Sequence, residues 1–146
     1  MQDRQTIVER IRNSADRYGP FNHQQLKQLL LVCRKSTDPE LFFGLFSFFF
    51  DTSLQDNSFE RQQLAGTILL KLSPACPLGL DGVVYAVPHY WDLSVEELPW
   101  YLCNIFGKEV VQHFLEELIP DVQNDQLQRS FKTMLFWANG YKSDVA

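Results

Sequence analysis

The sequence predicts an all-α protein. Apolar residues recur at helical spacing in almost every segment that lies between clusters of Pro, Gly and Asn. A chain of 146 residues, 45% of them hydrophobic, is long enough to bury a core without disulfides. We therefore expect a single domain, residues 1–146, with an N-terminal helix in 1–20, paired helices in 21–141 and a polar tail in 142–146.

The first three helices are delimited by residues typical of helix ends. Gly19 and Pro20 are expected to end the first helix, because neither residue continues a helix well. Asn22 is expected to cap the second helix through its side-chain oxygen. Asp38 and Pro39 are expected to begin the third, with Asp38 as the cap.

The third helix leads into Leu41–Phe50, which is apolar on nearly every side. Such a helix lies in a core or is covered by a partner. A strand is the competing interpretation, because runs of aromatic residues favour sheets. The Pro39 start and the helical neighbours favour a helix.

The later elements are expected to follow the same pattern. Asn57 should cap the fourth helix and Ser94 with Glu97 a later one, while the last helix should start near Asn124. The segment Pro74–Pro88 is the least regular, and we expect a short, broken helix there. The helix before the last is expected to turn a set of apolar residues inward, namely Val110, Val111, Phe114, Leu115 and Leu118.

Long helices begin at similar intervals, of 33 to 38 residues, marked by Leu26, Leu64, Leu98 and Phe131. With Arg61–Leu72 as the first helix of a pair, residues 21–141 resemble the HEAT-like family of α-helical repeats. The resemblance implies stacked helix pairs that bury a continuous core and expose one face for partners. An irregular bundle of seven or eight helices is the alternative.

Charge is distributed unevenly along the chain. The net charge is −5 and the isoelectric point near 5.1, which argues against direct binding of nucleic acid. Residues 92–125 contain eight acidic residues and one basic residue, Lys108, so this segment carries −7 and the remainder +2. An acidic segment of this kind attracts a basic protein partner.

Tyr and Trp residues flank the acidic segment, which is the composition of an interface anchor. The predicted partner-binding residues are Tyr90, Trp91, Asp92, Glu96, Glu97, Trp100, Glu116, Glu117 and Asp121. The alternative is that these carboxylates only keep the helices soluble.

No catalytic, cofactor-binding or metal-binding motif is present. His23, His89 and His113 lie too far apart in the sequence to form a zinc site by helical spacing. Three cysteines without a C-x-x-C pair, Cys33, Cys76 and Cys103, indicate free thiols in a reducing cytoplasm. Neither a secretory signal nor a membrane-spanning segment is expected.

The sequence therefore predicts a non-catalytic protein-binding module without cofactors. Its general character is similar to that of small bacterial toxin-immunity proteins, which implies an inhibitor of a basic, nuclease-like toxin. A helical scaffold or adaptor that binds an apolar peptide or helix near Phe42–Phe50 is the alternative. An enzyme using His89 or a cysteine is the lesser alternative.

Overall fold

The computed structural model describes residues 2–143, and within that range it contains eight α-helices and no β-strand. The predicted all-α fold is thus confirmed. Of the expected tail, residues 144–146 lie outside the described residues. The α-helices are α1 (Arg4–Tyr18), α2 (His23–Cys33), α3 (Asp38–Phe46), α4 (Ser58–Leu72), α5 (Leu80–Ala86), α6 (Glu97–Phe106), α7 (Lys108–Leu118) and α8 (Asp125–Gly140); the short 3-10 helices are η1 (Ser47–Phe49), η2 (Thr52–Leu54) and η3 (Ile119–Asp121).

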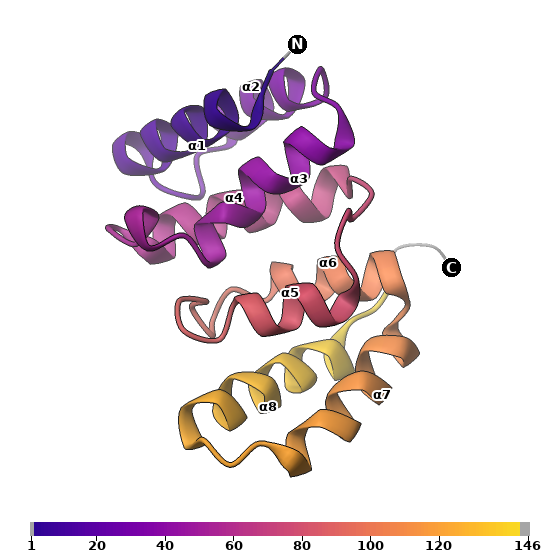
Figure 1. The fold of residues 1–146 in the computed structure, drawn as a ribbon. Helices are drawn as coiled ribbons and strands as arrows, with labels where there is room; N and C mark the ends of the chain where they lie inside the picture. Colours follow the sequence, from indigo (N-terminus) through magenta and orange to yellow (C-terminus); the bar gives the residue numbers. More distant parts are fainter. Residues whose placement is uncertain (1, 144–146) are drawn as a thin grey trace.

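The helices form a stack of successive layers (Figure 1). The pair α1 and α2 lies at one end and the pair α7 and α8 at the other, with α3 to α6 between them. Helix α1 packs on α3 and α4, α4 packs on α6, and α6 contacts both α7 and α8. One hydrophobic core therefore runs through the whole stack. Membership of the HEAT-like family stays a prediction.

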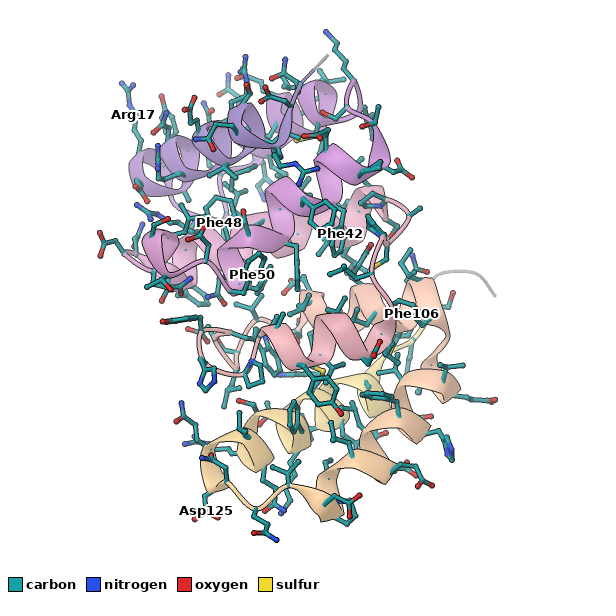
Figure 2. The ribbon with its side chains drawn as sticks, in the orientation of Figure 1. Arg17, Phe42, Phe48, Phe50, Phe106 and Asp125 are labelled. Atoms are coloured by element: carbon teal, nitrogen blue, oxygen red, sulfur yellow. The ribbon has the colours of Figure 1, made fainter. Side chains whose placement is uncertain are left out.

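The aromatic run lies in the core. Helix α3 ends at Phe46 and continues as the tighter turn η1, so the helical interpretation holds and the strand alternative is wrong. Phe42, Phe46, Phe48 and Phe49 are fully buried, whereas Phe50 at the end of the run is 40% exposed. Figure 2 labels Phe42, Phe48 and Phe50 within this part of the stack. The run thus supplies packing to the core and no continuous surface for a partner.

Some helix starts agree with the sequence and others do not. The side chains of Asn22 and Asn124 each accept a hydrogen bond, of 3.0 Å, from the backbone amide three residues further on. The predicted Asn22 cap is confirmed, and the last helix does start beside Asn124, which caps it in the same way. The Ser94 cap is wrong, because its hydroxyl donates to Asp92 at 2.6 Å and α6 begins only at Glu97.

At two other predicted caps the side chain binds elsewhere. Asn57 occupies the cap position of α4, as predicted, but its side chain forms no capping bond there. Asn57 has a left-handed backbone conformation, with φ of 53°, and its amide donates to Asp16 at 3.0 Å. Thr37 takes the cap position of α3 in place of Asp38. The Asp38 carboxylate instead accepts a hydrogen bond of 2.8 Å from the backbone amide of Ala75.

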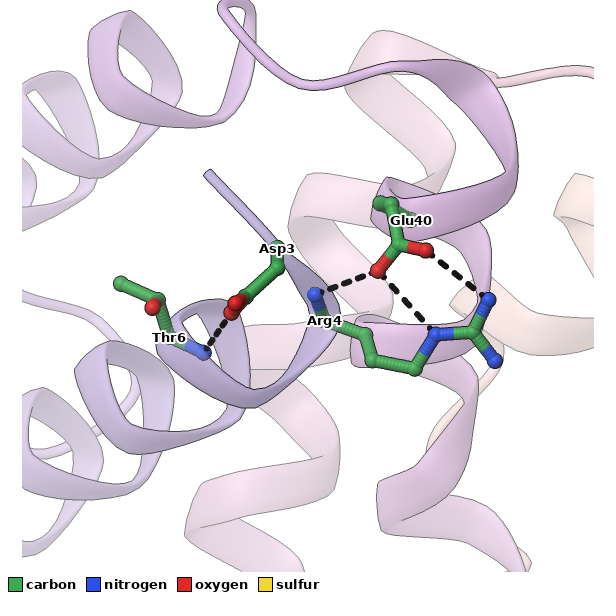
Figure 3. A network of polar contacts seen from close by, with 4 residues as sticks. All are labelled: Asp3, Arg4, Thr6 and Glu40. Carbon is green, nitrogen blue, oxygen red and sulfur yellow. Dashed lines mark hydrogen bonds and ion pairs between the residues drawn. The ribbon is translucent and has the colours of Figure 1, made fainter. Parts of the chain in front are cut away.

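A polar network joins the start of α1 to α3 (Figure 3). Asp3 caps α1 by accepting a 2.8 Å hydrogen bond from the backbone amide of Thr6. The carboxylate of Glu40 accepts bonds from both the backbone amide and the guanidinium of Arg4, at 2.7 and 3.0 Å. The Arg4 guanidinium lowers the pKa of Glu40. Because this network is exposed, it orients the two helices more than it stabilises them.

A second ion pair, between α1 and α4, is more enclosed. The buried guanidinium of Arg61 donates to both carboxylate oxygens of Asp16, at 2.9 and 2.8 Å, and to the carbonyl of Leu54 at 3.3 Å. Asn57 donates to the same carboxylate. These bonds, the one from Arg61 first, lower the pKa of Asp16.

This pair predicts an acid-dependent loss of stability. The pKa of Asp16 is lowered on folding, so its contribution is complete above the unfolded value of 3.8 and is lost as pH falls through the lower folded pKa. At neutral pH, Asp16→Asn should lower the free energy of unfolding by about 1–3 kcal/mol, because Arg61 loses its carboxylate partner. Urea titrations at several pH values should show this deficit shrinking below pH 3.8. The exposed Asp121→Asn, on η3 and away from Arg61, should give no such deficit, and a deficit for Asp16→Asn that is constant with pH would contradict the assignment.

Candidate functional site

The loop between α5 and α6, which contains the predicted aromatic cluster, is fastened to the core. Trp91 is only 4% exposed, and its indole N–H donates to the carbonyl of Val95 at 3.0 Å. The buried amide of Gln62 donates to the carbonyl of Tyr90 and accepts from the backbone amide of Asp92, both at 2.7 Å. Trp91 therefore belongs to the core, and we exclude it from the binding surface; Tyr90 stays exposed.

The first turn of α6 brings two of the predicted residues together. Glu97 and Trp100 line a hollow of about 500 Å³ together with Lys71 and Asn104. The indole of Trp100 donates to the carbonyl of Trp137 at 3.0 Å, which fixes the ring in the wall. One carboxylate oxygen of Glu97 is buried without a hydrogen bond in the described part of the chain. The half-buried Glu97 lies against Gly66 of α4 and contributes little to an open surface.

Glu96, next to Glu97, is also half buried. Burial raises the pKa of Glu96, and the neighbouring charge of Glu97 raises it further. Both carboxylates lie at the start of α6, whereas Glu116, Glu117 and Asp121 lie exposed on the last turn of α7 and on η3. The acidic segment therefore presents its exposed charge mainly along α7.

An apolar groove lies between α5 and α7, beside these exposed carboxylates. We call it the α5–α7 groove and define it by its lining residues. Its volume is about 620 Å³, and Tyr85 borders it with its ring 6.3 Å from that of Phe114. Tyr85 is 57% exposed and Val110 54% exposed, so the predicted inward orientation of Val110 is wrong. The lining residues are Leu80, Asp81, Glu109, Val110, His113 and Phe114.

Helical spacing aligns the acidic residues of α7 with one edge of this groove. Glu109 lies four residues before His113, and Glu116 and Glu117 lie three and four residues after it, so all three carboxylates neighbour His113 on one side of the helix. His113 lies 3.9 Å from the carboxylate of Glu117. An exposed apolar strip with acidic side chains along it is the composition of a protein-binding surface.

Only part of this groove could be predicted from the sequence. The charge of 92–125 pointed to α7, but Val110 and Phe114 have the spacing of core residues. Val110 is 54% exposed, whereas Phe114 is partly buried against the core, with its ring beside that of Tyr85 on α5. Tyr85 lies in the irregular segment Pro74–Pro88, where no pattern predicts a direction.

The three cysteine thiols serve packing and are not activated as nucleophiles. Burial raises the pKa of Cys33 and of Cys103 to about 11, and it also raises the pKa of Cys76. These side chains are protonated at neutral pH and are weak nucleophiles. His89 is exposed on the loop before α6. In the described part of the chain, no group of three or more His, Cys, Asp or Glu side chains is placed to hold a metal ion.

Comparison with known proteins adds no relative. No protein-family model, no curated protein and no solved structure matches the chain. Among residues 2–143, no helix has both the length and the apolar character needed to cross a membrane. The assignment of function therefore rests on the surface described above.

Proposed function

We propose that this protein is a non-catalytic binding module that holds a basic protein on the α5–α7 groove and the acidic side of α7. The observation that carries this proposal is an exposed apolar strip bordered by carboxylates. Val110 and Phe114 offer apolar contact, while Glu109, Glu116 and Glu117 offer charge. Interfaces commonly combine a central apolar or aromatic anchor with a polar rim of this kind.

The charge of the segment determines the class of partner. Residues 92–125 carry −7, and Glu116, Glu117 and Asp121 on α7 and η3 are exposed to solvent. A field of this sign accelerates encounter with a basic protein and repels an acidic one. Tyr85 and Phe114 replace Trp91 and Trp100 as the aromatic part of the surface.

The specific form that we propose is an inhibitor of a basic toxin, of the kind that bacteria neutralise with an immunity protein in the cytoplasm. A nuclease-like toxin contacts phosphates through Lys and Arg side chains. Carboxylates of α7 paired with those side chains would block the approach of the nucleic acid. Small size and acidic charge support this form.

The test compares two charge-reversal variants that change the net charge equally. Glu109→Lys with Glu116→Lys alters the proposed surface, while Glu9→Lys with Asp56→Lys alters exposed acids elsewhere. Glu96 and Glu97 are left intact, because reversing half-buried charges would disturb the fold. Each immobilised chain is incubated with lysate of the source cell, and captured proteins are identified by mass spectrometry.

We expect the unmodified chain and the control variant to retain the same basic protein, and the α7 variant to lose it. The captured protein, expressed separately, should cleave nucleic acid, and an equimolar amount of this chain should stop the cleavage. Equal capture by both variants, or a captured protein that is acidic, would refute the acidic-surface model. A basic partner without nuclease activity would refute the toxin-inhibitor form.

A scaffold that binds an apolar peptide is the second candidate, favoured by the apolar lining of the same groove. The surface first expected for it, Phe42–Phe50, is largely buried. Salt separates the two candidates. Binding of a basic protein weakens as salt rises, mainly through a slower association rate, whereas burial of an apolar peptide is not weakened.

A further inference from the structure

A second hollow, of about 330 Å³, lies between α1 and α2, in the layer that ends the stack opposite α7 and α8. Arg10 and Arg17 line it from α1, seven residues apart and so on one side of that helix. Ser14 lies between them on the same side. Leu29 and Val32 of α2 form its apolar part.

Every polar side chain around this hollow can donate a hydrogen bond, and none of the residues that line it is acidic. Within residues 2–143, neither Arg10 nor Arg17 forms an ion pair with a carboxylate. The nearby carboxylate of Asp16 is engaged by Arg61. Figure 2 shows the side chain of Arg17 extending away from the end of α1. The amides of Asn13, Gln25 and Gln28 offer further N–H donors beside their acceptor oxygens.

Ser14 gives an independent reason to expect an occupant. It is 6% exposed, and its hydroxyl oxygen is buried without a hydrogen-bond partner among the described residues. A buried polar group left unpaired in a free protein is destabilising, and such groups are expected where bound water or a ligand completes the bonding. Arg10 lies close enough to α2 that its charge opposes the rise in the pKa of Cys33.

We infer that the α1–α2 hollow binds a small organic molecule that carries an oxyanion, a carboxylate or a phosphate, on a compact apolar body. Arg10 and Arg17 would hold the oxyanion, since guanidinium groups pair with both kinds of head group in a bidentate way. Leu29 and Val32 would contact the apolar body. This site is separate from the α5–α7 groove and does not depend on the function proposed for it.

The test is a titration of the ¹⁵N-labelled chain followed by heteronuclear NMR, with phenyl phosphate, benzoate and neutral benzyl alcohol as probes. We expect phenyl phosphate or benzoate to shift the amides of α1 and α2 around Ser14 in a saturable way, and the comparison of the two identifies the preferred head group. Benzyl alcohol should bind at least about tenfold more weakly, because it lacks the charge.

Two variants with equal change of charge distinguish the site from general electrostatic attraction. Arg10→Gln with Arg17→Gln should weaken the preferred anion about tenfold or more. Arg12→Gln with Lys27→Gln removes two positive charges that do not line the hollow and should leave the affinity nearly unchanged. The proposal fails if both double variants lose affinity equally, if benzyl alcohol binds as tightly as the anions, or if no probe gives saturable shifts in α1 and α2.

Discussion

Phe42→Ala is expected to destabilise the protein by about 3–5 kcal/mol, a large part of the 5–15 kcal/mol that stabilises a domain of this size. Phe42 is fully buried, with its ring stacked 5.0 Å from that of Phe46 and packed edge-on 5.3 Å from that of Phe43. It also lies 6.1 Å from the ring of Tyr101 on α6. Truncation would therefore open a cavity where α3 meets the next layer of the stack.

Urea denaturation followed by far-ultraviolet circular dichroism measures this loss. Phe50→Ala is the matched control, because Phe50 ends the same run but is 40% exposed, and we expect a loss of about 1 kcal/mol. If Phe42→Ala destabilised the protein no more than Phe50→Ala, the aromatic run Phe42–Phe50 would not belong to the core. The hypothesis that this run binds a partner would then regain support.

Helix existence could be predicted from the sequence because the signals for it are local. Asn22 and Asn124 cap their helices with oxygens that reach amides three residues away, and within residues 2–143 no distant group competes for them. Asn57 has the same local pattern but its side chain is drawn to Asp16, which is 41 residues earlier in the chain. Such a competition depends on the packing of α1 against α4, which no short window of sequence contains.

In the candidate site, too, some features follow from the local sequence and others depend on tertiary packing. That residues 92–125 are acidic is a property of composition and needs no fold. Which of those residues face solvent depends on the covering helices: Glu96 and Glu97 are half covered, while Glu116 and Glu117 are exposed. The sequence predicts Trp91 as an interface anchor beside Asp92, but the turn from Val87 to Val95 folds the indole inward. Tertiary packing therefore determines which acidic residues are exposed, whereas the charge of the sequence identifies only the segment in which they lie.

One buried side chain, that of Gln62, holds the loop that contains Trp91 in place, and its replacement is expected to destabilise the protein strongly. Gln62 is fully buried on α4 and uses both ends of its amide on this loop, as donor to Tyr90 and as acceptor from Asp92. Gln62→Met keeps the approximate size of the side chain but leaves a carbonyl and an amide without partners. We expect a loss of about 2–4 kcal/mol in urea denaturation, since each unpaired buried group costs about 1–3 kcal/mol.

Gln62→Glu separates lost hydrogen bonding from lost packing. A protonated glutamic acid can still donate to the carbonyl of Tyr90 and accept from the amide of Asp92, whereas the ionised carboxylate would repel that carbonyl in a buried site. Burial raises the pKa of such a carboxyl, so the variant should be closest to the unmodified protein at mildly acidic pH and fall behind as pH rises. Gln62→Met should show a deficit that does not vary with pH in this way. If both size-matched variants were as stable as the unmodified protein at every pH, Gln62 would act by filling space, and the loop before α6 would be held by Trp91 instead of by the amide.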